Sequence, residues 1–414
     1  MPPPPPSPRP PPGEGRRKHR WQRCPTSEMR SWRADYLRDG FVIARNFLDE
    51  ATLMTMQDDM QHIVEKYAKR LSSAGRLAGA ANQRLDRTRG LSFDHRYTAL
   101  YEANLRSNAN RGKRSDLPAF FRGEGHSAGI YKFLTHARLH ELVRCLLPHE
   151  AEVPPALKLY PVYMLRGKVP DAISKSAMTV DWHQDAEYTY YWYTALNASQ
   201  SEIDVYANSV VNTWVPVTDV THELGPVQLV RKRPLSLTRA ELRCEGVGCG
   251  DDGIATANDS AIAREYLRVA EMDAYINAYP ERLVTAEMRR GDVLLFDQFT
   301  YHRGLPNISP NITRWSVDFR FQDARAPTMR SEPGFVLGSD DLAADAADAC
   351  GAPLIASDED WVAARPSLRL SEMRAAERNL AIGGNGWAVR HIHAGSLMGA
   401  LEMERSRFAR KRRD

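Results

Sequence analysis

A series of strand-like segments in the second half of the chain restricts the fold more than any other feature. Residues 210–217 and 227–230 are rich in β-branched side chains, and residues 293–296 form a short apolar run after a Gly-containing turn. Residues 314–321, Arg-Trp-Ser-Val-Asp-Phe-Arg-Phe, alternate in character along their length, as a strand with two different faces does. We therefore expect a core of antiparallel strands.

Helical patterns come before these strands. Asp49 is placed to cap a helix whose apolar residues recur at spacings of three and four, and residues 130–146 carry a second helical pattern that stops before Pro148. Residues 36–47 indicate the end of a helix, a Gly turn and a strand. Helices followed by many antiparallel strands predict an α+β fold with a barrel or sandwich core.

The two ends of the chain differ from its middle. The first residues are Pro-rich and then basic, so they cannot bury enough apolar surface to offset the entropy of ordering. The C-terminal part has further helical patterns and a basic end. The predicted organisation is a disordered tail (1–33), a main domain (34–324) and an extension (325–414). The main domain contains a long insertion (231–285) that holds a Gly-rich loop and a helix (261–272). The extension contains helices at 342–347, 370–380 and 397–413.

Composition excludes several classes of protein. With 43% hydrophobic and 26% charged residues and a net charge of +4, the chain resembles a soluble globular protein and not a dedicated nucleic-acid binder. No apolar run is long enough to span a membrane, so no membrane is expected as a partner. The near-balanced charge gives no reason to expect a specific nucleic acid. The oligomeric state stays open. The five scattered cysteines predict free or packed thiols in a reducing, cytoplasmic location: Cys24, Cys145, Cys244, Cys249 and Cys350.

One short motif carries chemistry. In Trp182-His183-Gln184-Asp185 an imidazole and a carboxylate would share one face of a strand, although a His-x-Asp triplet by itself is common. His302 lies at the end of the strand expected over residues 291–301, and Arg314 opens the next strand. Two His and one carboxylate can bind one face of Fe(II) and leave three positions open for a 2-oxo acid and O2. Arg314 could then hold the far carboxylate of the 2-oxo acid.

Several further segments occur with this motif in a characteristic order. They are residues 39–48 (Asp-Gly-Phe-Val-Ile-Ala-Arg-Asn-Phe-Leu), 214–226 (Trp-Val-Pro-Val-Thr-Asp-Val-Thr-His-Glu-Leu-Gly-Pro), 290–296 (Arg-Gly-Asp-Val-Leu-Leu-Phe) and His302-Arg-Gly. With these segments the chain resembles the phytanoyl-CoA dioxygenase family of Fe(II)/2-oxoglutarate oxygenases. The resemblance implies a double-stranded β-helix (a jelly-roll, cupin-like core) with helices packed outside.

The resemblance also implies roles for single residues. His183, Asp185 and His302 would bind iron, and Arg314 would hold 2-oxoglutarate. Trp214 and Lys168 match positions near the cosubstrate, but Trp214 could equally be core packing and Lys168 a solvated strand end.

Substrate residues are predicted from position. Five aromatic residues follow the His-x-Asp motif, and Tyr188 is the nearest of them to Asp185; Asn212 shares a strand face with Trp214. Residues 230–234 (Val-Arg-Lys-Arg-Pro) replace the Pro-Gly-Ser-His of many relatives, so the substrate of the family cannot be transferred. Because Asp185 is retained, hydroxylation or a related oxidation (desaturation, epoxidation or ring closure) is favoured over halogenation. The remaining aromatic residues are Tyr190, Tyr191, Trp192 and Tyr193.

We therefore expect an Fe(II)- and 2-oxoglutarate-dependent dioxygenase that uses O2 to oxidise, most simply to hydroxylate, a small organic metabolite with release of succinate and CO2. Two alternatives remain open. One is an oxygenase of this class whose acyl substrate is bound to coenzyme A or a carrier. The other is a non-catalytic scaffold that acts through its Pro-rich and basic tails.

Other motifs carry no function. Residues 248–253 fit the GxGxxG pattern but follow no strand, and Cys244 and Cys249 lack a second pair of zinc ligands. His391 and His393 lack a third ligand nearby.

Overall fold

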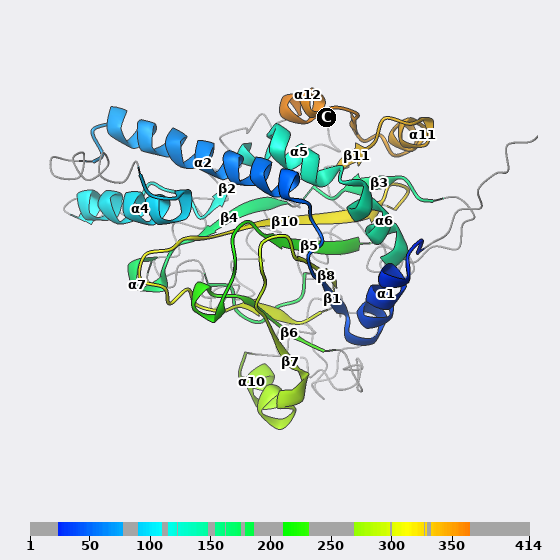
Figure 1. Ribbon diagram of the computed structural model, residues 1–414, viewed down its shortest axis with the longest axis horizontal. Coiled ribbons are helices and arrows are strands. Elements are labelled where there is room, and N and C mark those ends of the chain that lie inside the picture. Colours follow the sequence, from blue (N-terminus) through cyan, green and yellow to red (C-terminus); the bar gives the residue numbers. More distant parts are fainter. Residues whose placement is uncertain are drawn as a thin grey trace, which may run out of the picture.

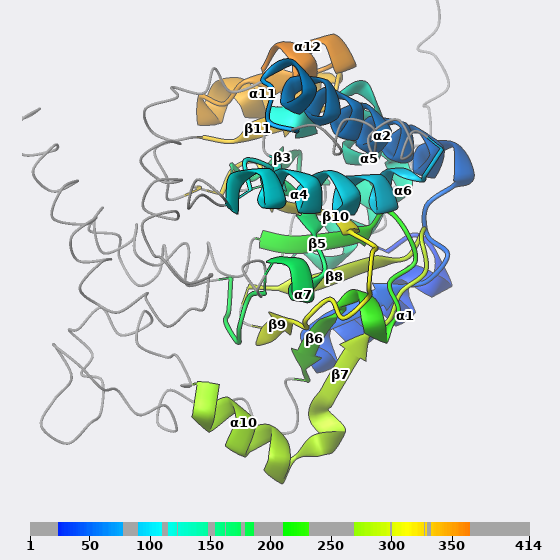
Figure 2. The same cartoon turned by 90° about the vertical axis from the view of Figure 1, so that its left-hand side faces the viewer.

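Two sheets lie face to face, and helices cover the outer face of the larger sheet (Figure 1; Figure 2). The computed structural model describes residues 24–77, 90–109, 115–121, 123–147, 154–161, 163–174, 179–185, 210–231, 269–298, 300–326, 328 and 333–364. The layers therefore run from helices through the large sheet to the small sheet, and the candidate site lies between the two sheets.

The large sheet is mainly antiparallel. Its strands follow the order β1-β8-β5-β10-β3-β11-β12, and β4 pairs with both β10 and β2 at one side of this path. The strands are β1 (Phe41–Ala44), β2 (Phe120–Phe121), β3 (Leu157–Leu159), β4 (Met164–Lys168), β5 (Val210–Pro216), β8 (Val293–Asp297), β10 (Arg314–Asp323), β11 (Phe335–Leu337) and β12 (Leu354–Ile355).

The small sheet has the order β7-β6-β9 and is antiparallel. Its strands are β7 (Leu283–Ala286), β6 (Val227–Val230) and β9 (His302–Gly304). A shared apolar cluster joins the two sheets: Trp214 and Phe296 of the large sheet pack with Leu229 and Ala286 of the small one. Two facing sheets closed by a common core are the jelly-roll arrangement that the sequence predicts.

Strand β10 lies at the centre of the large sheet and pairs with β5, β4 and β3. All its residues from Arg314 to Gln322 are buried, although alternate ones are polar. Trp315, Val317, Phe319 and Phe321 belong to the large apolar cluster shared with the helices. Because successive side chains of a strand point to opposite faces, the polar residues of β10 face the small sheet.

The helical layer forms where the sequence predicts it. Asp49 caps α2, and its Oδ1 accepts a hydrogen bond from the Thr52 amide at 2.8 Å. Buried apolar residues of α2, α5 and α6 pack on the outer face of the large sheet (Figure 1). The helices are α1 (Ser27–Asp39), α2 (Glu50–Ser73), α4 (Phe93–Ala109), α5 (Ala128–Leu134), α6 (Ala137–Leu146), α7 (Asp171–Ser174), α10 (Val269–Ala278), α11 (Asp341–Cys350) and α12 (Asp358–Ala363), with 3₁₀ turns η1 (Gly123–Gly125), η2 (His222–Leu224) and η5 (Pro280–Arg282). The prediction of an α+β fold with a jelly-roll core and external helices is confirmed.

The ends of the main domain differ from the prediction. Helix α1 begins at Ser27, inside the segment expected to be a disordered tail, because Met29 and Trp32 bury apolar surface in the core. At the other end, β11 pairs with β3, so the predicted extension continues the large sheet. Strand β7 also belongs to the core, although its first three residues fall in the predicted insertion.

Two expected helices can be compared with the described residues. Helix α11 confirms the pattern at residues 342–347, and helix α10 occupies residues 269–278 where a helix was expected over 261–272. Several segments named in the sequence analysis lie outside the described residues: residues 251–268, the GxGxxG segment, Cys244, Cys249, His391, His393 and residues 370–380 and 397–413. In the part of the chain that is described, no helix is both long and apolar enough to cross a membrane.

The expectation for two of the cysteines is wrong, because Cys24 and Cys145 form a disulfide. The two residues are separated by 121 positions, so no local sequence pattern marks them as partners. They meet because α1 packs against α6, where Arg33 Nε donates to the Cys145 carbonyl oxygen at 2.9 Å. Disulfides are uncommon in reducing compartments, so the cysteines no longer favour a cytoplasmic location, which stays a prediction. Cys350 is a free thiol.

A single buried tryptophan fastens the C-terminal segment to the body. Trp361 of α12 is fully buried, its Nε1 donates to the Gly125 carbonyl oxygen at 2.9 Å, and its ring stacks on His126 with centroids 3.8 Å apart. We predict that Trp361→Ala lowers the free energy of unfolding by about 3–5 kcal/mol, because it leaves a large cavity. Urea unfolding followed by circular dichroism measures this.

The matched control for this substitution is Val362→Ala, at the next residue of the same helix, whose side chain is 46% exposed. It should change the free energy by less than about 0.5 kcal/mol. Equal effects of the two substitutions would contradict the anchoring role of Trp361.

Candidate metal centre

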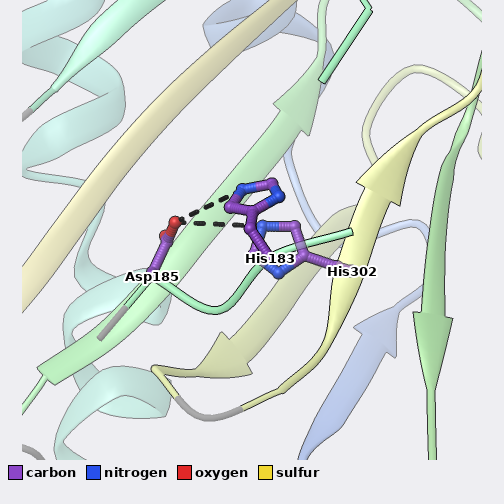
Figure 3. Close-up of side chains that lie close together, drawn as sticks. All are labelled: His183, Asp185 and His302. Atoms are coloured by element: carbon purple, nitrogen blue, oxygen red, sulfur yellow. Dashed lines mark ion pairs between the residues drawn. The ribbon is translucent and has the colours of Figure 1, made fainter. Parts of the chain in front are cut away.

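Two imidazoles and one carboxylate meet between the sheets (Figure 3). Asp185 Oδ1 lies 3.8 Å from His183 Nε2 and 3.9 Å from His302 Nε2. All three residues are buried, and one possible ligand atom from each falls within 4.8 Å of the other two. The three side chains that the sequence singled out are therefore brought together and could hold one metal ion.

The backbone fixes the two imidazoles beside each other. His183 and His302 form an isolated antiparallel bridge in which each amide donates to the other residue's carbonyl oxygen at 3.0 Å. Their rings lie with centroids 4.1 Å apart. Each ring also has its Nδ1 close to a backbone carbonyl oxygen, that of Asp181 at 2.7 Å for His183 and that of Thr300 at 2.9 Å for His302. These carbonyls accept the Nδ1 proton, so Nε2 carries the lone pair that a metal needs.

Two local predictions about this site are wrong. His302 does not end the strand expected over residues 291–301; β8 stops at Asp297 and His302 opens β9 in the other sheet. The chain turns at Thr300, whose amide donates to the Asp297 carbonyl oxygen at 3.3 Å. The His-x-Asp motif is likewise a single bridge followed by a turn and not a strand. The sequence gives no sign of the break between β8 and β9, because the chain passes from one sheet to the other within a few residues.

The protonation states of the three groups suit a divalent ion. Burial, together with the charge of the neighbouring His302, lowers the pKa of His183 to about 3, and burial also lowers the pKa of His302. Burial alone would raise the pKa of Asp185, but the Arg320 guanidinium and the two imidazoles outweigh it and hold that pKa well below its usual range. At neutral pH the cluster is two neutral imidazoles and one carboxylate, which are the states in which these groups bind metals.

Asp185 has a further partner that the sequence analysis missed. Arg320 of β10 donates to Asp185 Oδ2 from Nη2 at 2.5 Å and from Nε at 3.1 Å. The signal was present in the alternation of β10, because Arg320 occupies the same strand face as Arg314. Nothing in the sequence, however, shows which residue that face meets.

Two buried cations lie side by side on neighbouring strands of the large sheet. Arg314 of β10 and Lys168 of β4 are paired in register, so both side chains lie on the inner face of the sheet. Burial, with the charge of Arg166, lowers the pKa of Arg314 to about 9; burial, with the charge of Arg314, lowers that of Lys168 to about 7. Among the described residues neither cation forms an ion pair, so the pair is suited to an anion. The alternative of a solvated strand end is wrong for Lys168, which is 3% exposed.

Backbone oxygens and one aromatic ring complete the surroundings of these cations. Arg314 Nη1 donates to the Gly225 carbonyl oxygen at 3.2 Å, and Lys168 Nζ donates to the Leu305 carbonyl oxygen. The Arg314 guanidinium lies 5.2 Å from the centroid of the Trp214 ring. Trp214 therefore combines its two predicted roles, since it packs in the core between the sheets and touches Arg314.

Other polar atoms of the inner face lack partners. Within the described residues, neither Asn212 Nδ2 nor Oδ1 has a hydrogen bond, and the same holds for Ser316 Oγ and Arg314 Nε. Asn212 is paired in register with Arg320, and Ser316 lies one pleat from Arg314. Buried polar groups are nearly always hydrogen-bonded, so these atoms fit a bound polar molecule. Tyr188, Tyr190, Tyr191, Trp192 and Tyr193 lie outside the described residues.

Comparison with known proteins agrees with this geometry. The sequence profile of the phytanoyl-CoA dioxygenase family matches residues 36–315, about two thirds of the chain. The chain belongs to the phytanoyl-CoA dioxygenase family. It is therefore a dioxygenase of the Fe(II)/2-oxoglutarate class, and its cluster of two imidazoles and one carboxylate fits the iron on which that class depends. No protein with curated annotation matches the chain.

Three solved structures are among those that match the chain. The epimerase SnoN from nogalamycin biosynthesis, solved with Fe3+, alpha ketoglutarate and nogalamycin RO, is 18% identical over 72% of this chain and 86% of its own, with a TM-score of 0.38. The apo monooxygenase ThoJ is 15% identical over 85% and 99%, with a TM-score of 0.42. EctD from S. alaskensis with 2-oxoglutarate and 5-hydroxyectoine is 13% identical over 71% and 76%, with a TM-score of 0.39. These values are too low to transfer a substrate or a reaction to this chain.

The cluster predicts one specific metal site. We expect His183→Ala to weaken the binding of Co(II) by at least about 100-fold, because it removes one of three ligands. Anaerobic titration of the apoprotein, followed by visible absorption, measures the affinity. The control is His140→Ala, which removes an equally buried imidazole from α6, far along the chain from the cluster. Unchanged Co(II) affinity in the His183 variant would show that the metal binds elsewhere.

Proposed function

We propose that this enzyme hydroxylates a small organic molecule and that His183, Asp185 and His302 hold its iron. One observation carries the proposal: a cluster of two neutral imidazoles and an ionised carboxylate shares the inner side of the fold with two buried cations that have no ion-pair partner among the described residues. The cluster supplies three ligands for a metal, and the cations supply a site for the anionic end of a cosubstrate. Both parts lie between the same two sheets.

In this proposal Arg314 and Lys168 hold the distal carboxylate of 2-oxoglutarate. Arg314 offers a planar set of donors that matches a carboxylate, and Lys168 adds a point charge from the neighbouring strand. Ser316 Oγ, one pleat along β10, is a further donor without a partner among the described residues. Trp214 lies beneath the guanidinium and restricts its orientation. The far end of the bound molecule would then point along the inner face of β10 toward Asp185.

Bound iron, with 2-oxoglutarate and O2, would supply the oxidising power for inserting oxygen into a substrate C–H bond, with succinate and CO2 as the other products. The chain's own contribution is to hold these reactants and to exclude water. His183, Asp185 and Arg314 are each less than 10% exposed, which keeps the reacting groups away from bulk solvent.

Asn212 is the described residue best placed to contact the substrate. Its amide is fully buried on the inner face, beside Arg320, and both of its polar atoms lack partners among the described residues. An amide offers two donors and an acceptor, so a substrate with a hydroxyl or carbonyl group near the oxidised carbon would satisfy it. Tyr188 stays a prediction from sequence.

Succinate release over a library of small metabolites tests the reaction directly. Turnover with a free small molecule would support the proposal, whereas inhibition by free coenzyme A and turnover only of acyl thioesters would favour a carrier-bound substrate. If no compound supports succinate release and the protein binds no iron, the scaffold alternative is favoured, and deletion of the two tails should then abolish partner binding.

The role of Arg314 gives a quantitative prediction. Anaerobic addition of Fe(II) and 2-oxoglutarate to the wild-type protein should produce a weak visible charge-transfer band, and titration of that band gives the affinity for 2-oxoglutarate. Arg314→Ala should lower this affinity by about 10- to 100-fold, since a hydrogen bond to a charged group contributes about 1.5–3 kcal/mol. His183→Ala should remove the band altogether. A band of normal affinity in Arg314→Ala would mean that another residue holds the carboxylate.

Lys168 makes the binding of 2-oxoglutarate depend on pH. Its pKa in the free protein is about 7, so the cation is present below pH 7 and is lost above it. A bound carboxylate favours the charged lysine and raises its pKa, so the affinity should be highest below pH 7. It should then fall by up to about tenfold per pH unit as the pH rises from 7 to 8.5.

Titrations of the band between pH 6 and 8.5 measure this dependence. The pKa of His183, about 3, lies outside the window. Lys168→Arg should keep the affinity and remove the pH dependence, whereas Lys168→Met should lose both. The same slope in wild type and Lys168→Arg would show that another group titrates.

A further inference from the structure

Arg320 is the one arginine among the described residues that is hydrogen-bonded to a member of the candidate metal cluster. It lies on the inner face of β10, opposite Asn212 of β5, and is 5% exposed. Its charge is balanced by Asp185 and by the nearby Asp318, which together raise the pKa of Arg320 in spite of its burial. The guanidinium is therefore charged, and its two hydrogen bonds to Asp185 fix its position.

The contacts divide the two oxygens of Asp185 between different neighbours. Oδ1 faces the two imidazoles, at 3.8 Å from His183 Nε2 and 3.9 Å from His302 Nε2 (Figure 3). Oδ2 accepts both hydrogen bonds from Arg320, at 2.5 and 3.1 Å. One oxygen is thus directed at the metal position and the other is already bound to a cation.

We propose that Arg320 is a positioning residue that makes Asp185 bind the metal through Oδ1 alone. This inference rests on the proposed function of the cluster. A carboxylate can bind a metal through one oxygen or through both. With two imidazoles and one carboxylate oxygen as ligands, three positions of an octahedron stay open, and a second oxygen from Asp185 would fill one of them. Arg320 prevents this by holding Oδ2, so there is room for the two oxygens of 2-oxoglutarate and for O2.

A purely electrostatic role would leave the coordination of the metal unchanged. Arg320 is a cation beside a site for a divalent cation, so its removal would by charge alone strengthen metal binding and weaken the binding of the anionic 2-oxoglutarate. The positioning role instead predicts that removal frees Oδ2 to bind the metal. The metal stays bound, its coordination changes, and 2-oxoglutarate must compete with Oδ2 for a position.

The experiment uses the full chain loaded with Co(II), whose visible absorption depends on its coordination. Wild type, Arg320→Met and Arg320→Lys are compared by absorption and by calorimetric titration with 2-oxoglutarate. We expect Arg320→Met to bind Co(II) with an altered absorption spectrum and to bind 2-oxoglutarate about 10- to 100-fold more weakly. Arg320→Lys, which keeps the charge but not the planar set of donors, should lie between the two.

The matched control is Arg96→Met, which removes another buried arginine from an ion pair, with Glu65 in the helical layer. It accounts for the loss of stability that follows the removal of a buried arginine from an ion pair, and it should leave the Co(II) spectrum and the 2-oxoglutarate affinity as in wild type.

The inference is overturned if Arg320→Met shows the wild-type Co(II) spectrum, whether or not the affinity for 2-oxoglutarate falls, because loss of charge alone would lower that affinity. It is also overturned if only substrate-dependent succinate release is lost, since Arg320 would then contact the substrate. Should Arg320→Met fail to fold, Arg320→Lys decides, and a spectrum and affinity equal to wild type reject the positioning role. If wild type itself binds no 2-oxoglutarate with Co(II), the proposed function fails first, so the two failures can be distinguished.

Discussion

The rest of the structure depends on how β10 separates two environments. This strand pairs with β5, β4 and β3, and its alternate side chains give the strand an apolar outer side and a polar inner side. Trp315 and Phe319 anchor the helical layer, whereas Arg314 and Arg320 are buried on the side of the metal cluster. Burying so many polar groups is costly unless they have partners. The inner face is consequently built around ion pairs, backbone carbonyls and groups that are suited to a bound molecule.

Electrostatics then separates two parts of this inner face. Near Asp185, the carboxylate and Arg320 compensate each other, and the imidazoles stay neutral. Near Lys168 and Arg314, two cations lie together with no ion pair among the described residues, and burial together with the charge of Arg314 lowers the pKa of Lys168. The first part is suited to a metal ion and the second to a carboxylate. Their arrangement on one strand, Arg314 at its start and Arg320 farther along, sets the order of the two ligands along the site.

Much of this could be predicted from local patterns. Strand β10 and helix α2 follow directly from the spacing of their polar and apolar residues, and side-chain chemistry and chain order alone point to His183, Asp185 and His302 as metal ligands. Other features have no local signal. The disulfide between Cys24 and Cys145 and the pairing of Arg320 with Asp185 both join residues more than a hundred positions apart. The place of His302 in the second sheet was also missed, because a short crossing interrupts no hydrophobic pattern.

The sequence by itself therefore determined where regular elements such as β10 and α2 form and which side chains could bind a metal, since both follow from spacing and side-chain chemistry. Only the tertiary structure decided which oxygen of Asp185 faces the imidazoles, which cation holds the other oxygen, and which buried groups lack partners among the described residues. The physical reason is that hydrogen bonds, pKa values and desolvation depend on neighbours in space. In this fold those neighbours come from two sheets whose strands lie far apart along the chain.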